Sequence, residues 1–244
     1  MPTTNDGPNP ADLTSVGSAK DWIPGFKNNP APDATIQKLI TGVSRDIVRM
    51  LGAMADHDSS SATYGMNTLN SQIHFTLTLD GNGSDVLFPP VRPIQQIIKL
   101  IVNGYTPSIN PAYGQPGVCI ETDGYSLAFQ GGFGSGGTTN TVGWQFGGAS
   151  GRFPMGRRNI LLECIAGYGV PVAGSSPPAW SAPDDLEVAV LQIIALNYVR
   201  RDRVGLASEN IQGTSSTSYA KYEYPPEALA VLQRYVRVPL GGQA

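Results

Sequence analysis

A glycine-rich run is the first stretch of this chain whose composition suggests chemistry. Residues 131–137 read Gly-Gly-Phe-Gly-Ser-Gly-Gly, which invites comparison with a phosphate-binding loop. Such a loop needs a lysine after its last glycine and a helix whose N-terminus faces the phosphate. Thr138, Thr139 and Asn140 follow instead. We therefore interpret the run as a flexible loop tip.

A metal site is the second chemistry to consider, at the Asp-His-Asp sequence of residues 56–58. Neighbours in sequence point in different directions, and metal sites usually need three or four convergent ligands. Histidine is also scarce, since only His57 and His74 are present. The other acids form no recognisable acid–base pair, and those at 184–187 suit the dipole of a helix N-terminus. We therefore predict no catalytic residue, no metal and no cofactor, and we expect that the chain is not an enzyme.

The two cysteines, Cys119 and Cys164, lie far apart in sequence and match no metal-binding spacing. Each is flanked by residues that favour β-strands. We expect buried free thiols, because free cysteine behaves as a small apolar side chain. A disulfide between them is the alternative.

Basic residues cluster at 200–203 and at 152–158, in a chain whose formal net charge is −3. No overall basic field is therefore available to hold nucleic acid. A solvated helix end explains the first cluster, and a contact with a neighbouring subunit or with DNA is its functional alternative.

Targeting and membrane segments are not expected. The N-terminus has neither a basic region nor an apolar run. The longest apolar stretch, 186–199, is interrupted by polar residues and is shorter than the ~20 residues that a bilayer requires. We expect a protein made in the cytoplasm that binds no membrane.

Hydrophobic periodicity divides the chain into two helical ends and a β-rich middle. Apolar residues recur at helical spacing from Asp33 to Gly52, after Pro183, and after Pro225-Pro226, and a short helix with Asp12 as its N-cap is expected before them. The loop at 206–218 is polar, with a brief strand expected at 219–224. The segments predicted to be strands are 73–79, 86–88, 94–102, 117–122, 125–130, 142–146 and 160–165.

The segment 94–102 is ambiguous, because its isoleucines also fit helical spacing. Its β-branched composition and the Asn103-Gly104 pair that follows favour a strand. Together the elements predict an α+β fold, in which a helical bundle formed by the N- and C-terminal helices carries an inserted antiparallel β-rich domain. The expected order is a disordered arm at 1–10, N-terminal helices at 11–54, the β-rich domain at 55–182, C-terminal helices at 183–240 and a tail at 241–244.

Four stretches carry a family resemblance through their order. The first contains the two N-terminal helices, and the second runs from Leu79-Asp80-Gly81-Asn82-Gly83-Ser84 through Arg92-Pro93-Ile94 to Asn103-Gly104. The third includes Phe153-Pro154 and Ala166-Gly167-Tyr168, and the fourth runs from Pro183-Asp184-Asp185-Leu186 to the last helix. Over most of the chain this order resembles the head–tail connector (adaptor, head-completion) proteins of long-tailed bacteriophages. The glycine-rich insertion at 114–150 is longer than in the minimal members.

The resemblance implies a structural protein in the neck of the virion, made in the host cytoplasm. About a dozen copies would form a ring beneath the portal protein. The ring would carry genomic DNA through its lumen without sequence-specific binding, and a stopper or tail-completion protein would dock onto it. Terminal segments tend to reach the portal in such rings. This implies partner contacts at Tyr235, Arg237 and Leu240. The basic cluster adds Arg200, Arg201 and Arg203 as candidate contact residues.

Another virion binding module is the alternative, such as a tail-completion or capsid-attached protein. Its β domain would recognise a protein partner or a glycan. Aromatic residues of the β-rich middle motivate this alternative, because aromatic surfaces bind both kinds of partner. They are Tyr113, Tyr125, Phe129, Phe133, Trp144 and Phe146.

Overall fold

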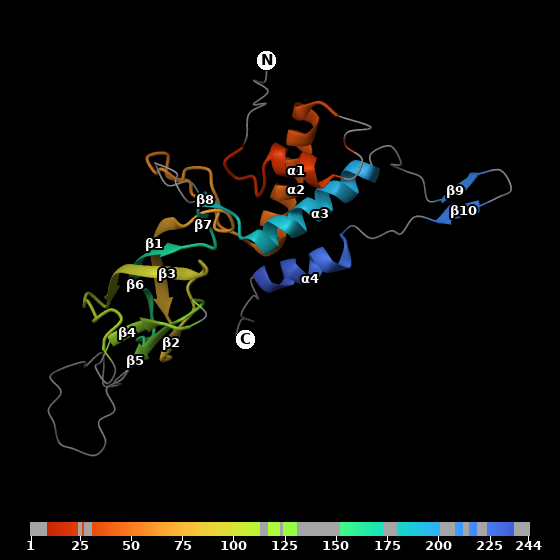
Figure 1. Cartoon of the computed structure of the whole chain (residues 1–244). Helices are drawn as coiled ribbons and strands as arrows, with labels where there is room; N and C mark the ends of the chain where they lie inside the picture. Colours follow the sequence, from red (N-terminus) through yellow and green to blue (C-terminus); the bar gives the residue numbers. More distant parts are fainter. Residues whose placement is uncertain are drawn as a thin grey trace, which may run out of the picture. The chain divides into compact units, whose positions relative to one another are not determined.

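The chain folds as two compact units, each described here by itself. The computed structural model describes residues 9–23, 26, 31–112, 117–122, 124–130, 152–172, 180–200, 208–211, 215–218 and 224–236. The helical unit comprises Met1–Asn70 and Val170–Ala244, and the β unit comprises Ser71–Gly169. Helices and antiparallel sheets together make an α+β protein, as the sequence predicts (Figure 1).

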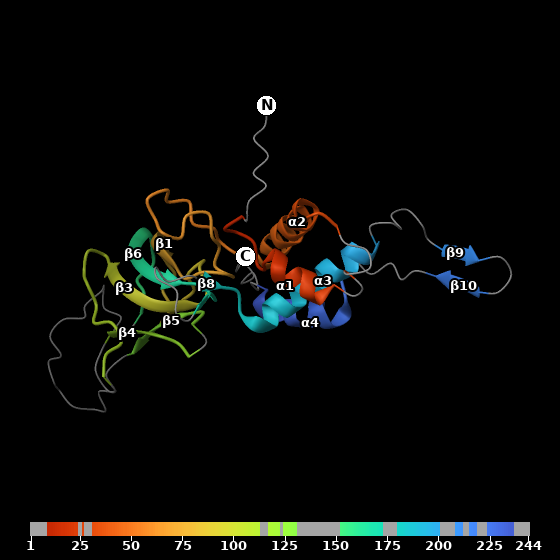
Figure 2. The same cartoon turned by 45° about the horizontal axis from the view of Figure 1, so that its top comes forward.

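The helical unit combines the two ends of the chain. Helix α3 contacts each of the other three helices and lies between α2 and α4 (Figure 2). Its buried residues surround more than one face, from Leu186 and Val190 to Leu191 and Ile194, which suits a central helix. The helices described in this unit are α1 (Val16–Trp22), α2 (Asp33–Leu51), α3 (Asp184–Arg200) and α4 (Pro226–Tyr235).

Helix α2 confirms the strongest helical prediction. One apolar face is buried, including Ile36, Ile40 and Ile47, and Gly52 ends the helix in the left-handed conformation with φ 64°. Helix α4 begins at Pro226 as expected. Of the apolar residues expected to face inward, Leu232 is buried and Leu229 is exposed, and Ala228 is buried as well.

The first helix begins later than the sequence predicts. Ser15, not Asp12, is the N-cap of α1, and its hydroxyl oxygen accepts a hydrogen bond from the Ser18 N–H at 3.1 Å. Asp12 is occupied elsewhere, because its carboxylate accepts hydrogen bonds from Gln37 and Thr41 of α2. A long-range contact therefore decides between two residues that are both good caps.

The boundaries between the two units lie inside the predicted β-rich domain of 55–182. Residues 55–70 belong to the helical unit. Asn70 Nδ2 donates to the Pro10 and Asp12 carbonyls at 2.8 and 3.1 Å, and Asn67 Nδ2 donates to the Ala11 carbonyl at 3.0 Å. These buried amides attach the loop to the N-terminal segment, a connection that local sequence patterns do not encode.

A three-stranded antiparallel sheet forms the core of the β unit. Strand β6 (Gly156–Ala166) lies at its centre, with β1 (Ile73–Gly81) and β3 (Ile94–Val102) at the edges. The strand prediction for 94–102 is confirmed, and Asn103 and Gly104 form the turn after it with φ of 49° and 79°. Leu100 of β3 and Ile160 and Leu162 of β6 are fully buried and line the inner face of the sheet.

A second antiparallel sheet of three strands completes the β unit. Its order is β2 (Val86–Leu87), β5 (Leu127–Gln130) and β4 (Gly117–Ile120). The strand predicted at 86–88 is present as β2, and it pairs with β5 in this other sheet. Sequence neighbours therefore do not pair here.

Two short strand pairs lie in the helical unit, where the sequence predicts loops. Strands β7 (Val170–Pro171) and β8 (Trp180–Ser181) pair in the proline-rich linker, and β9 (Ser208–Ile211) pairs with β10 (Ser215–Ser218) in the polar loop. Several predicted segments lie outside the described residues: the strand at 142–146, most of that at 219–224, residues 1–8 of the arm at 1–10, and the tail at 241–244. Tyr224 is in a bend. In the described part of the chain, no helix is long and apolar enough to cross a membrane.

Candidate functional site

The Asp56-His57-Asp58 sequence forms a loop that is closed by its own hydrogen bonds. Asp56 Oδ1 accepts the Asp58 N–H at 2.9 Å, and Oδ2 accepts the Thr63 hydroxyl at 2.6 Å. Burial alone would raise the pKa of Asp56, but hydrogen bonds from Thr63, Asp58 and Ser61 lower it below its ordinary value of 3.8. The carboxylate therefore shapes the loop. Across the described ranges, no three His, Cys, Asp or Glu side chains gather into a possible metal site.

Both thiols are free, so the disulfide alternative is wrong. Cys164 is buried in β6, and burial raises its pKa to about 12, which keeps it protonated and unreactive. Cys119 in β4 is half-buried, and its thiol lies 3.5 Å from the Ala128 carbonyl on the neighbouring strand. Both cysteines thus contribute to strand packing.

Two of the motifs behind the family resemblance meet inside the β unit. Pro93 accepts a hydrogen bond from the Gly167 N–H at 2.9 Å. The Arg92 guanidinium lies 5.3 Å from the centre of the Tyr125 ring, whose hydroxyl is 2.8 Å from that of Tyr168. The Arg-Pro-Ile motif leads into β3 and the Ala-Gly-Tyr motif follows β6. Contacts between the two motifs therefore connect these neighbouring strands at one end.

Gly124 shows how closely this junction is packed. Its φ is 69°, and a Cβ at this position would lie 2.9 Å from Cβ of Pro93. Its carbonyl accepts the Ile94 N–H at 2.7 Å. A side chain here would push apart the backbone contacts of the junction. These motifs thus encode packing and offer no reactive group.

Of the aromatic residues that motivate a recognition surface, the structure describes Tyr125 and Phe129. Phe129 packs against fully buried Phe153 with ring centres 4.5 Å apart, and Tyr125 belongs to the junction with Tyr168. Both therefore serve the interior of the β unit. Tyr113, Phe133, Trp144 and Phe146 lie outside the described residues.

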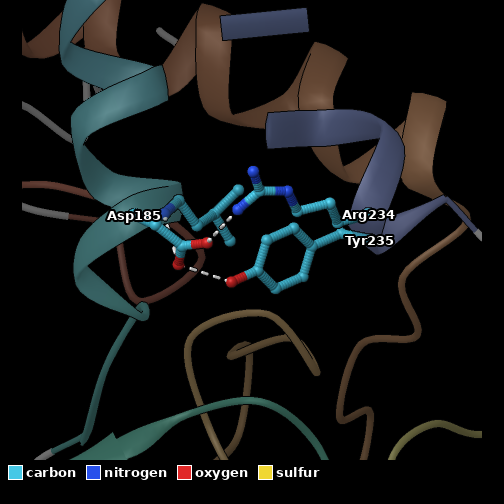
Figure 3. A network of polar contacts seen from close by, with 4 residues as sticks. Asp185, Arg234 and Tyr235 are labelled. Carbon is cyan, nitrogen blue, oxygen red and sulfur yellow. Dashed lines mark hydrogen bonds and ion pairs between the residues drawn. The ribbon is translucent and has the colours of Figure 1, made fainter. Parts of the chain in front are cut away.

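Tyr235 is the predicted partner residue whose contact is clearest. Its hydroxyl donates to Asp185 Oδ1 at 2.6 Å, and the Arg234 guanidinium lies 4.0 Å from Asp185 Oδ2 (Figure 3). We call Asp185, Arg234 and Tyr235 the α3–α4 clasp. It ties the end of α4 to the start of α3.

Of the remaining predicted partner residues, the structure describes only Arg200, which does not lie at the clasp. Arg200 is the last residue of α3 and is half-buried. An α-helix rises about 1.5 Å per residue, which places Arg200 about 22 Å along α3 from Asp185. The structure therefore does not bring Arg200 and Tyr235 together. Arg201, Arg203, Arg237 and Leu240 lie outside the described residues.

Buried polar contacts hold the N-terminal segment against α2. Asp12 Oδ2 accepts hydrogen bonds from Gln37 Nε2 at 2.5 Å, from the Thr41 hydroxyl at 3.1 Å and from the Asn9 N–H at 3.2 Å. Burial raises the pKa of Asp12 above 3.8, although these hydrogen bonds and the charge of Arg45 oppose the shift.

Ser44 also holds this segment, since it is buried and its hydroxyl oxygen accepts the Leu13 N–H at 3.1 Å. The helical pattern places Ser44 among the surface residues of α2. Its partner lies 31 residues earlier in the chain, so this contact leaves no local signal.

The helical unit exposes two faces of opposite charge. Lys38, Arg45 and Arg49 are exposed on α2 at spacings of seven and four residues, which places them on one side of the helix. Asp184 and Asp185 are exposed at the start of α3, where Asp185 also pairs with Arg234 in the α3–α4 clasp. We call these the basic α2 face and the acidic α3 end.

No protein-family model and no curated protein matches this chain. A chain from the virion of a native gene transfer agent particle is similar over 94% of this chain and 92% of its own length, with 16% identity and a TM-score of 0.45. A chain from the neck of an empty gene transfer agent particle, computed with C6 symmetry, has 16% identity and a TM-score of 0.46 over 95% and 94%. A third, from the neck of a native particle computed with C12 symmetry, has 16% identity and a TM-score of 0.43 over 96% and 98%.

Proposed function

We propose that this chain is a structural protein of the neck of a tailed-phage particle, a head–tail connector whose copies form a ring beneath the portal protein. Genomic DNA passes through the lumen, and a stopper or tail-completion protein docks onto the ring. The role requires no catalysis and no cofactor. The order of the four sequence stretches supports it, and so does the helical unit built from both chain ends.

The pair of oppositely charged faces carries the proposal. A closed ring joins unlike surfaces of identical subunits, so each copy must present two complementary faces. The basic α2 face of one copy meets the acidic α3 end of the next. Charge complementarity of this kind speeds association and fixes the orientation of the partners.

Exposed apolar side chains supply the affinity that charge alone does not. Val188 and Val199 on α3 and Leu229 on α4 have exposed fractions of 37%, 47% and 38%. Removing such surface from water is the main favourable contribution to most protein association. Of these residues, Val188 lies beside the acidic α3 end on the same helix.

The α3–α4 clasp gives the C-terminal segment a role in this ring. It holds the end of α4 against the start of α3 (Figure 3). Arg237 and Leu240 then dock on the portal. The basic cluster that contains Arg200 lies at the opposite end of α3, where it contacts a neighbouring subunit or DNA. A terminal segment that becomes ordered on its partner can wrap a large surface at modest affinity per contact.

Native mass measurement tests the proposal, with the purified chain alone and after mixing with the portal of its particle. A ring of about a dozen copies in either sample supports it. A monomer or dimer that ignores the portal contradicts it.

Charge reversal tests the faces themselves. Arg45→Glu with Arg49→Glu should abolish the ring, because two acidic surfaces then meet. Arg157→Glu with Arg158→Glu makes the same charge change at exposed positions of the β unit and should leave the ring intact. Equal loss in both variants would show that net charge, and not the α2 face, controls assembly.

A different virion binding module is the second candidate function. Exposed Phe88, Tyr105 and Met155 of the β unit, with Met155 82% exposed, favour it. Deleting 131–141 tests it. Loss of binding to a protein partner or glycan while the ring still forms would assign recognition to the β unit.

A further inference from the structure

The two edges of the central sheet of the β unit differ in how they are protected. Edge strand β3 is irregular in two places, between Ile94 and Gln96 and between Ile97 and Lys99. Lys99 on this strand also approaches Glu163 at 3.8 Å. Irregular pairing and lysine are devices that keep an edge strand from pairing with another chain.

Edge strand β1 has none of these devices over most of its length. Seven consecutive residues, 73–79, pair with β6 without interruption, and the only register shift lies at the end, between Leu79 and Gly81. The strand sequence, Ile-His-Phe-Thr-Leu-Thr-Leu-Asp-Gly, contains no proline, lysine or arginine. Among the described residues, no backbone hydrogen bond joins 73–79 to any strand but β6. This edge is therefore open to a further strand.

The side chains of β1 fit an added strand of small polar residues. His74, Thr76 and Thr78 are exposed on one face, and threonine pairs well with serine or threonine across strands. On the other face Leu77 and Leu79 are only half-buried, because no strand lies beside them. A neighbouring strand would cover both.

The chain contains a segment that lacks such a neighbour. Strands β9 and β10 form a two-stranded sheet, with no third strand among the described residues (Figure 1). Their sequences, Ser-Glu-Asn-Ile and Ser-Ser-Thr-Ser, contain a single apolar residue, Ile211. An isolated two-stranded hairpin is at best marginally stable in water and needs a further strand or an apolar face.

We infer that the β9–β10 hairpin of one copy adds to the β1 edge of the next copy, extending its three-stranded sheet to five. This inference rests on the proposed ring, to which it adds a second contact between subunits. The four-residue strands of the hairpin fit within the seven regular residues of β1. Backbone hydrogen bonds give such strand addition its affinity. One hairpin and one open edge in every copy make the contact head-to-tail, as a closed ring requires.

Cysteine cross-linking tests the inference in the assembled full-length chain, alone or on the portal. Thr76→Cys combined with Thr217→Cys, in a Cys119→Ser background, is treated with a short bismaleimide. Pairing between copies gives a ladder of covalent oligomers under denaturing conditions. A product of one chain only, or no product, overturns the inference.

Controls identify the edge and separate this inference from the proposed function. Each single-cysteine variant should give no ladder, and Gln96→Cys on β3 combined with Thr217→Cys should give none either. An equal ladder from the β3 pair overturns the choice of edge. Native mass of the same samples reports the ring independently, so a ring without a ladder refutes the hairpin contact while the connector function stands. Absence of both refutes the two together.

Hydrogen exchange tests the same contact without cysteines. In the assembled wild-type chain, amides of 73–79 should exchange about tenfold more slowly than in a variant whose residues 208–218 are replaced by a Gly-Ser linker. Amides of β3 should not change. Equal exchange of 73–79 in both assemblies overturns the inference, even if the cysteine variants fail to fold.

Discussion

The helical unit and the β unit are held together in different ways. In the helical unit, segments from the two chain ends meet, and half-buried Asp12 and buried Asn67, Asn70 and Ser44 fix the contacts of the N-terminal segment. In the β unit, long antiparallel ladders on β6 fix the order of the strands, and the interior is almost wholly apolar.

This difference indicates where each unit is suited to bind. In the helical unit, buried side chains hold the segments together, so the outer faces of the helices can carry charge, as the basic α2 face does. In the β unit, strand pairing holds the segments together, so each sheet has edge strands, and an unprotected edge strand can accept another strand. The two units thus offer two chemically distinct kinds of subunit contact.

The largest effect should come from the core of the β unit. Leu162→Ala, at a fully buried position of β6, should lower the free energy of unfolding by about 2–5 kcal/mol, through lost burial and the cavity left behind. Urea denaturation measures the loss. Hydrogen exchange should show the loss of protection confined to the β unit. Equal loss in the helical unit would contradict the division into two units.

The sequence predicted elements well where the local signal was strong. Helix α2 has an apolar face and Gly52 at its end, and 94–102 has β-branched residues and a turn pair, so both predictions are confirmed. The pairing of the strands could not be predicted in the same way. Strand β2 pairs with β5 although β1 is nearer in sequence, because pairing depends on contacts between distant residues that no local pattern encodes.

The interaction residues were less predictable than the fold. The sequence selected Tyr235 from its place near the chain end, but its partner Asp185 lies 50 residues away. The β9–β10 hairpin was missed because its polar sequence does not alternate with apolar residues. Such a strand is defined by its neighbour more than by its own composition.

A smaller effect should follow loss of the amide that attaches loop 55–70 to the N-terminal segment. Asn70→Ala removes hydrogen bonds to the Pro10 and Asp12 carbonyls and the oxygen that accepts the Asn67 N–H. Buried groups left without partners should lower the free energy of unfolding by about 1–3 kcal/mol. Thermal denaturation measures it. Asn82→Ala, at an exposed turn of the β unit, should change stability much less, and equal losses would contradict the buried-anchor interpretation.

The contribution of Asp12 to the free energy of unfolding should depend on pH. Because burial raises its pKa in the folded state, the protonated carboxyl stabilises the fold, fully below pH 3.8 and progressively less as pH rises through the folded pKa. Asp12→Asn does not ionise. The free energy of unfolding of the wild type minus that of the variant should therefore fall as pH rises over this range, by less than the full effect of Asn70→Ala.

Asp56 provides the matched control, since its pKa is lowered in the folded state. Its ionised carboxylate stabilises the loop above pH 3.8, and this stabilisation is lost as pH falls through the folded pKa. The difference between the wild type and Asp56→Asn should therefore rise with pH. Denaturant titration at several pH values measures both differences, and the same slope for the two residues would contradict the assignment of Asp12 as a buried anchor.

The α3–α4 clasp should show the smallest effect on stability. Tyr235→Phe keeps the ring and removes only the hydrogen bond to Asp185, whose carboxylate is 45% exposed, so water can replace the lost donor. The free energy of unfolding should fall by about 0.5–1 kcal/mol. If the clasp directs the C-terminal segment to the portal, affinity for the portal should fall by more than stability does, which titration against purified portal would show. Arg234→Ala should have the weaker effect of the two, because an exposed pair 4.0 Å apart contributes little. Unchanged portal affinity in both variants would reduce the clasp to a local contact between α3 and α4.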